Sequence, residues 1–204
     1  MVNYDLMAEN FDTEERIERS KAFADELRKH IIDGENKSAI EFGCGTGLVG
    51  FELINNFNSI TFIDASAGMI KQVEQKLFNM GIRKSRAICC DLMKTMPKNI
   101  SADYIFSSLV LHHIIETEHI LTCLFNLLNK NGRLLIIDLD TDDGNFHTHH
   151  ADFDGHNGFE QLFLSDLCKK IGFSKTEIKT FYHACRVING NEKPYSLFIM
   201  EAMK

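Results

Sequence analysis

The sequence has no apolar run long enough to cross a membrane. None of its uninterrupted apolar stretches approaches the roughly 18 residues that a membrane-spanning helix needs. It also lacks the basic-then-apolar N-terminal segment of a secretory leader. We therefore expect a soluble, cytoplasmic protein that does not associate with membranes.

No two cysteines have the CxxC spacing that zinc and redox sites use. The six cysteines are scattered over the chain, at positions 44, 89, 90, 123, 168 and 185. This distribution is typical of reduced thiols and not of a disulfide or zinc framework.

The sequence also lacks a basic region. It has 22 Lys and Arg against 29 Asp and Glu, a formal charge of −7. Nucleic-acid binders usually neutralise phosphates with a basic face. Apart from a short cluster at residues 83–86, which reads as a solvated turn, no such face is evident, so we expect no nucleic-acid partner.

What is present is enough apolar material for one core. The chain has 204 residues, of which 44% are hydrophobic, and it shows no repeats or low-complexity segments. That length suits one buried domain and is short for two. We therefore expect a single domain over residues 1–204.

The most informative segment is Glu41-Phe42-Gly43-Cys44-Gly45-Thr46-Gly47, which follows a short apolar run and opens into a helix-like stretch. Alternating glycines remove every second Cβ, so a ligand can lie close to the backbone. A strand, a glycine turn and a helix in succession point helix N–H groups at that ligand. The segment therefore predicts a cofactor site.

Two cofactors satisfy this pattern. Residues 45–50 also fit the GxGxxG of dinucleotide-binding oxidoreductases. Asp64 ends the next apolar run, about 20 residues further on, where an acid recognises ribose hydroxyls. Asp64 thus indicates a nucleoside cofactor without identifying it.

The surrounding segments resemble one family. Glu41, the helix-like sequence before it, and the glycines resemble the first motif of class I S-adenosylmethionine-dependent methyltransferases, acidic-x-Gly-x-Gly-x-Gly. Three later segments resemble further motifs of that family, in the same order: Asp64-Ala65-Ser66-Ala67-Gly68-Met69, Cys90-Asp91-Leu92, and Ser107-Ser108-Leu109-Val110-Leu111-His112-His113. The resemblance implies S-adenosyl-L-methionine as cofactor and a small-molecule acceptor.

It also implies a role for each matching residue. The glycine loop would approach the methionine end, supported by Glu41; Asp64 would accept the ribose hydroxyls, and Asp91 would accept from the adenine amino group. An ordinary strand-end acid is the alternative for both aspartates, and core filling is the alternative for Met69. The expected cofactor-binding residues are Glu41, Gly43, Cys44, Gly45, Gly47, Asp64, Ala65, Met69, Asp91, Leu92 and Ser108.

The expected fold class is α/β: a Rossmann-like, doubly wound, seven-stranded, mostly parallel sheet with a C-terminal antiparallel hairpin and helices on both faces. An N-terminal helical cap covers residues 1–36, with a helix that begins at a capping box from Asp12 and ends near Gly34. Asn131-Gly132 reads as a turn before the strand 133–139. We expect the remaining strands at 38–42, 60–63, 86–90, 103–107, 175–183 and 195–203, and the last helix at 159–171.

Histidine is the side chain best suited to accept a proton near neutral pH. His113 follows the fourth strand, at the edge where the methyl group should point, and is the first catalytic candidate. His112 is adjacent, so both should not face the pocket in a regular segment. His156 is the second candidate, because residues 156–159 resemble a segment of some small-molecule methyltransferases. For either histidine, a packing role is the alternative.

The polar segment 140–158 is longer than an ordinary connection and reads as a lid. Its run of His and Asp invites a metal site, but the HxHxDH register fails at His150-Ala151, so we expect none. Tyr4 and Phe11 resemble residues that cover the cofactor, with a hydrophobic staple as the alternative.

Two motifs that the sequence lacks argue against certain classes of methyl acceptor. After the fourth strand comes Ser107-Ser108-Leu109-Val110, without the Asn/Asp-Pro-Pro-aromatic motif of enzymes that methylate amino groups of DNA and protein. No acid stands where metal-dependent catechol methyltransferases hold their ion. We expect an enzyme that methylates a small molecule, as a monomer or homodimer. The rival classes are a nicotinamide-dependent oxidoreductase and a non-catalytic, partner-activating module.

Overall fold

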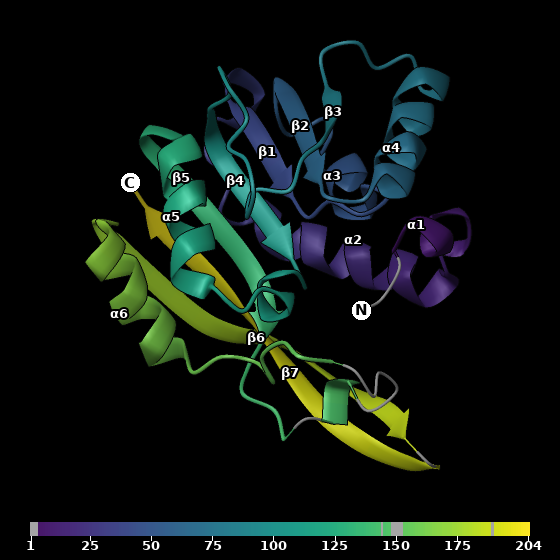
Figure 1. Cartoon of the computed structure of the whole chain (residues 1–204), viewed down its shortest axis with the longest axis vertical. Helices are drawn as coiled ribbons and strands as arrows, with labels where there is room; N and C mark the ends of the chain where they lie inside the picture. Colours follow the sequence, from purple (N-terminus) through teal and green to yellow (C-terminus); the bar gives the residue numbers. More distant parts are fainter. Residues whose placement is uncertain (1–3, 144, 148–152, 189) are drawn as a thin grey trace.

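The computed structural model describes residues 4–143, 145–147, 153–188 and 190–204. Its strands form one seven-stranded sheet in the order β3-β2-β1-β4-β5-β7-β6 (Figure 1). The strands are β1 (Ser38–Phe42), β2 (Ser59–Asp64), β3 (Arg86–Cys89), β4 (Ala102–Ser108), β5 (Leu128–Leu139), β6 (Lys175–Ile188) and β7 (Asn191–Met203). The helices are α1 (Tyr4–Met7), α2 (Glu14–Arg28), α3 (Leu48–Glu52), α4 (Ala67–Asn79), α5 (Thr117–Leu127) and α6 (Gln161–Ile171).

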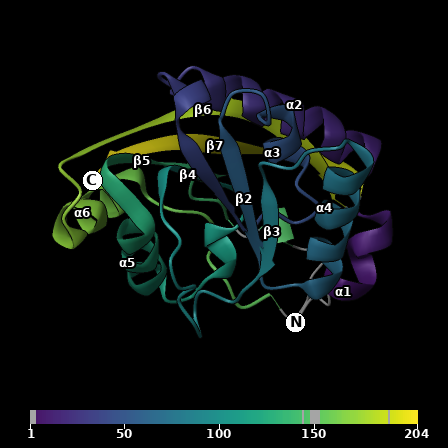
Figure 2. The ribbon, with the colours of Figure 1, turned by 90° about the horizontal axis from the view of Figure 1, so that it is seen from above.

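Strands β1 to β5 run parallel, and β7 runs against them and against β6. β1 pairs with β2 and β4 in parallel, whereas β7 is antiparallel to both β5 and β6. Helices α2, α3 and α4 cover one face, and α5 and α6 cover the other (Figures 1 and 2). The expected fold class is confirmed.

The apolar residues of β5 fit its position at the centre of the sheet, between two layers of helices. Residues Leu134 to Leu139 of β5 are buried on both faces because helices cover both sides of the sheet at this position. Parallel strands β1, β2, β3 and β4 all end at one edge, and their ends and the loops that leave them carry the four motifs that resemble the methyltransferase family. The fold therefore brings the candidate site together at this edge of the sheet.

Three predicted boundaries at the chain's ends are wrong. Thr13, and not Asp12, caps α2, because its side chain accepts from the Arg16 N–H; Asp12 instead bonds Thr46 and Lys76. The helix ends at Arg28, before Gly34. The terminal hairpin is longer than expected, because residues 184–188 and 191–194 extend the pairing beyond the predicted strands. It projects past the rest of the sheet (Figure 1).

Two internal boundaries also differ. Asn131-Gly132 lies within β5, where Asn131 takes a φ of 62° and the pairing with β4 shifts register. The predicted turn is therefore a local irregularity in a continuous strand. Helix α6 begins at Gln161, because the Phe159 N–H bonds to the Leu139 carbonyl and holds the preceding residues outside the helix.

Candidate active site

The glycine loop turns sharply between β1 and α3. Gly43, Gly45 and Gly47 have φ values of 64°, 52° and 80°, a left-handed conformation that favours glycine. At Gly43, an added Cβ would lie 2.5 Å from the Val110 side chain. At Gly45, by contrast, the nearest atom to such a Cβ is 3.6 Å away on Phe11. The loop thus packs tightly at its start and opens at its centre.

Glu41 lies beneath this loop, buried in β1. Its Oε1 accepts from the Gly50 N–H at 3.2 Å, while Oε2 has no hydrogen-bond partner among the described residues. Burial raises the pKa of Glu41 to about 8. A side chain at Gly50 would place its Cβ 2.2 Å from Oε2, so glycine is required there for Glu41 to fit.

Asp64 ends β2 and is tied to the glycine loop. Its Oδ2 accepts from the Gly45 N–H at 2.8 Å, and Oδ1 accepts from the Ser66 N–H at 2.9 Å. Burial raises the pKa of Asp64 despite these bonds. Each carboxylate oxygen has a further lone pair, so the residue retains acceptor capacity toward the cavity.

Asp91 follows β3 in a more open position. Its Oδ1 accepts from the Met93 N–H at 3.0 Å, and Oδ2 lies 2.9 Å from Lys94 Nζ. The hydrogen bond from Lys94 holds the pKa of Asp91 below its ordinary value.

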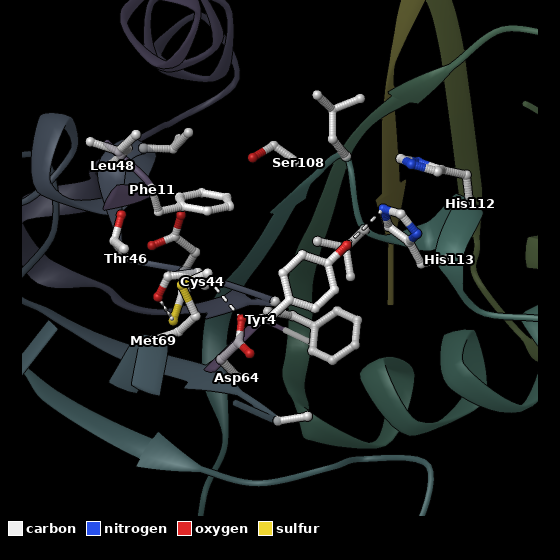
Figure 3. A pocket seen from close by; sticks show the side chains of 18 of the residues that line it. Tyr4, Phe11, Cys44, Thr46, Leu48, Asp64, Met69, Ser108, His112 and His113 are labelled. Carbon is white, nitrogen blue, oxygen red and sulfur yellow. Dashed lines mark hydrogen bonds between the residues drawn. The ribbon is translucent and has the colours of Figure 1, made fainter. Parts of the chain in front are cut away.

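These residues meet around one cavity of about 410 Å³ at the carboxyl edge of the parallel strands. Figure 3 shows Asp64 and Met69 on its glycine-loop side, with Tyr4 between them and the histidines. Gly47 does not line the cavity; its N–H donates to the Cys44 carbonyl and it precedes α3. All the other expected cofactor residues line it: Glu41, Gly43, Cys44, Gly45, Asp64, Ala65, Met69, Asp91, Leu92 and Ser108.

The N-terminal segment closes one side of the cavity, and Tyr4 and Phe11 both line it. Asp5 anchors the segment on the start of α4, where its Oδ1 accepts from Ser66 Oγ at 2.6 Å and from the Gly68 N–H at 2.8 Å. Asp12 accepts from the Thr46 hydroxyl and, at 2.8 Å, from Lys76 Nζ.

The two adjacent histidines both line the cavity, whereas only one was expected to do so in a regular segment. The reason is the tight 3-10 turn η3 (Leu111–His113), which places the two ring centroids 4.1 Å apart. The Nε2 of His113 lies 3.5 Å from the Tyr4 hydroxyl (Figure 3).

His112 forms a buried pair with Asp138 near the end of β5. Its Nδ1 donates to Asp138 Oδ1 at 2.6 Å, and its Nε2 has no hydrogen-bond partner in the described part of the chain. Burial alone would raise the pKa of Asp138, but His112 and the N–H groups of His112 and Leu139 hold it below its ordinary value. The carboxylate thus fixes the ring that faces the cavity. Sequence reasoning missed Asp138, although an acid in an otherwise apolar strand was a usable signal.

His156 lies elsewhere. Its Nε2 is 3.1 Å from both the Ile114 carbonyl and the Thr117 hydroxyl, and its N–H donates to the His112 carbonyl at 2.7 Å. It is not among the described residues that line the cavity. The contacts make His156 a support for the loop after β4.

Of the expected lid 140–158, residues 144 and 148–152 lie outside the described residues. Phe146 and His147 line the cavity, and the His147 ring stacks on the Phe153 ring with 3.6 Å between the ring centres.

No group of three or more potential metal ligands occurs among the described residues. In the same part of the chain, no helix has the length and apolar character to span a membrane.

Arg16, Arg19 and Arg186 also line the cavity, and sequence reasoning missed them. Two come from α2 and one from the extended part of β6, so their approach depends on the fold. No motif in the sequence marks them.

Comparisons with known proteins agree with this geometry. A family model described as a methyltransferase domain matches residues 33–198. An uncharacterised methyltransferase of Schizosaccharomyces pombe is 31% identical over 157 residues, which cover 69% of this chain and 55% of the relative. The chain therefore spans little more than half the length of that relative.

Solved structures show the same fold. An S-adenosylmethionine-dependent methyltransferase from Aquifex aeolicus matches with a TM-score of 0.67 and 14% identity, over 98% of this chain and 97% of the other. A Haemonchus contortus phosphoethanolamine N-methyltransferase matches with a TM-score of 0.72 and 14% identity, over 87% and 51%. The chain belongs to the methyltransferase domain family, as its resemblance to class I S-adenosylmethionine-dependent methyltransferases implies.

Proposed function

We propose that this protein transfers a methyl group from S-adenosylmethionine to a small-molecule acceptor, with residues 1–204 acting as one domain. The observation that carries the proposal is one cavity with two different halves. One half has the glycine loop, Glu41 and Asp64; the other has histidines and arginines and no counterpart of these motifs. A donor and an acceptor would meet between them.

The residues present fit the cofactor. The buried Oε2 of Glu41 lacks a hydrogen-bond partner among the described residues, and the loop is open at Gly45. The acids that line the cavity among the described residues, Glu41, Asp64 and Asp91, stand in the half with the glycine loop. Acidic acceptors of this kind suit an ammonium group, a ribose diol and an adenine amino group.

When bound, S-adenosylmethionine supplies a methyl group on a sulfonium, which is a good leaving group. The protein's own contribution is then to position the acceptor and to exclude water. Tyr4 and Phe11 would cover the half of the cavity that has the glycine loop. The segment around Phe146 would act as the lid of the half that has the histidines. If the attacking atom carries a proton, a nearby base must remove it.

We propose His113 as that base, oriented by the Tyr4 hydroxyl. His112, which is held by Asp138, lies next to His113 and is the alternative base. His156 was the second candidate from the sequence; its contacts with main-chain carbonyls favour a supporting role. The acceptor of the Haemonchus enzyme is not transferred to this chain, because 14% identity shows the fold alone.

Calorimetry tests the cofactor. We expect S-adenosylhomocysteine to bind with one site per chain and NADH to give no heat of binding. NADH binding without S-adenosylhomocysteine binding would instead support the oxidoreductase alternative. A protein that binds S-adenosylhomocysteine yet labels no compound in broad acceptor panels would fit the non-catalytic module.

Replacing His113 by Ala should lower the methyl-transfer rate about 100-fold, because the proton acceptor is lost. Affinity for S-adenosylhomocysteine should stay within about 2-fold, since His113 lies in the acceptor half. Single-turnover assays with labelled donor, paired with calorimetry, measure the two effects.

The matched control is His183→Ala, which removes an exposed histidine of β6 and should leave both quantities unchanged. A normal rate in His113→Ala together with a large loss in His112→Gln would move the base to His112. Normal rates in both variants would contradict histidine base catalysis.

A further inference from the structure

Three arginines line the cavity in a chain of net charge −7. Arg16 and Arg19 lie one turn apart on α2, and Arg186 approaches from β6 on the projecting part of the hairpin. All three are partly buried. Guanidinium groups gathered at a cavity wall are unfavourable unless an anion neutralises them.

Two of these arginines lie close to one pair of aromatic side chains, Tyr195 and Phe146. Burial raises the pKa of Tyr195 and the charge of nearby Arg19 opposes that rise; the Tyr195 ring lies 5.0 Å from that of Phe146. The guanidinium carbon of Arg186 lies 4.2 Å from the centre of the Phe146 ring, and its Nη1 donates to the Phe146 carbonyl. The two guanidiniums thus flank one aromatic pair.

The protein supplies little negative charge to balance them. Among the described residues, the three arginines form one ion pair, between Arg19 Nη1 and exposed Glu15 at 3.5 Å. Arg16 donates to the Phe11 carbonyl at 2.9 Å and lies over the Phe11 ring. Burial, and the charge of Arg19, lower the pKa of Arg16.

The wall between the arginines and the histidines is continuous. The Phe146 ring lies 6.1 Å from the ring of His112 and 5.0 Å from that of His147. Arg186 is therefore separated from the histidines by one aromatic ring. An acceptor held at its far end by Arg186 would present its other end to His112 and His113.

Charge thus differs along the cavity, with acids at the glycine loop and the Arg186 guanidinium on the Phe146 ring that adjoins His112. We propose that Arg19 and Arg186 bind an oxyanion of the acceptor, so that the substrate is a small molecule carrying a carboxylate or phosphate. Guanidinium forks match both groups through paired N–H donors. Arg16, next to Phe11 and the glycine loop, stands at the boundary of the two halves. This inference rests on the proposed methyl transfer and specifies its acceptor.

The binding test uses malonate and inorganic phosphate as probes, with malonamide as the neutral match for malonate. Each is titrated calorimetrically into protein saturated with S-adenosylhomocysteine, at low ionic strength. We expect at least one anion to bind, and the double variant Arg19→Gln/Arg186→Gln to bind it at least about 10-fold more weakly, the factor lost with one charged hydrogen bond. Arg83→Gln, which removes an exposed arginine before β3, should have no effect.

Which anion binds distinguishes a carboxylate site from a phosphate site. Failure of both anions to bind the unaltered protein would overturn the inference, as would equal binding by the double variant or by malonamide.

An activity test separates this inference from the proposed function. A metabolite extract is divided by anion exchange, and each fraction is incubated with labelled methyl donor. We expect labelled product from the anionic fraction, and less of it with the double variant. Label confined to products of the neutral or cationic fraction would overturn the anionic acceptor and leave methyl transfer intact. Failure to bind S-adenosylhomocysteine would overturn the proposed function itself.

Discussion

Replacing Asp64 by Ala is expected to weaken S-adenosylhomocysteine binding at least about 100-fold. Two ribose hydroxyls would lose a charged acceptor, and each such hydrogen bond contributes about 1.5 kcal/mol or more. The variant also removes the acceptor of the Gly45 and Ser66 N–H groups, so the loop loses its tie to β2. Calorimetry at fixed pH measures the affinity.

A second ligand separates these two causes. S-adenosylhomocysteine without its 2′-hydroxyl should bind the unaltered protein more weakly than the complete molecule. If Asp64 holds the diol, the Ala variant should show little difference between the two ligands. An unchanged preference for the hydroxyl in the variant would place the ribose elsewhere. Asp25→Ala, on the exposed side of α2, is the control and should bind normally.

Replacing Glu41 by Gln is expected to stabilise the cofactor-free protein at alkaline pH. The carboxyl has a pKa of about 8 in the folded protein, because burial disfavours its charge, against an ordinary value of 4.5 in the unfolded chain. Between these values the folded state holds a proton that the unfolded chain has released, so the free energy of unfolding falls as pH rises. The full effect is about 5 kcal/mol above pH 8 and is absent below pH 4.5.

The glutamine variant has no such proton and should lack this part of the pH dependence. Urea unfolding at pH 6 and pH 9 therefore gives the check: the advantage of Glu41→Gln over the unaltered protein should grow between the two. Glu74→Gln, on the exposed face of α4, should show no growing advantage. A constant difference between Glu41→Gln and the unaltered protein would mean that Glu41 is ionised in the folded state.

The sequence was most informative where a short segment carries its own structural or chemical signal. Alternating glycines, strand-end acids and apolar runs each carry their own signal, so the sheet, its hairpin and the cofactor half of the cavity were predictable. Gly47 shows the limit of a motif: it lies in the glycine run but serves the start of α3. Helix starts show the same limit. Asp12 was expected to cap α2, but it pairs with Lys76, which is distant in sequence, and Thr13 caps the helix instead.

The acceptor half was not predictable because its residues meet only through the fold. Arg19 on α2 and Arg186 on β6 are separated by most of the chain, and neither sits in a recognisable pattern. The hairpin was expected to stop near His183, which would leave no strand to carry Arg186 to the cavity. His112 was set aside on the assumption of a regular segment, which the 3-10 turn breaks.

The anchored N-terminal segment has a practical consequence for handling the protein. Tyr4 lines the cavity and Asp5 is fastened to α4, so an affinity tag ahead of residue 4 is only a few residues away in sequence from a side chain that lines the cavity. Lys204, in contrast, is held against α5 and β5 by bonds from its Nζ to the Phe125 and Leu128 carbonyls, away from the projecting hairpin (Figure 1). Purification handles belong at that end, and ligand titrations on N-terminally tagged protein should be repeated after the tag is cleaved.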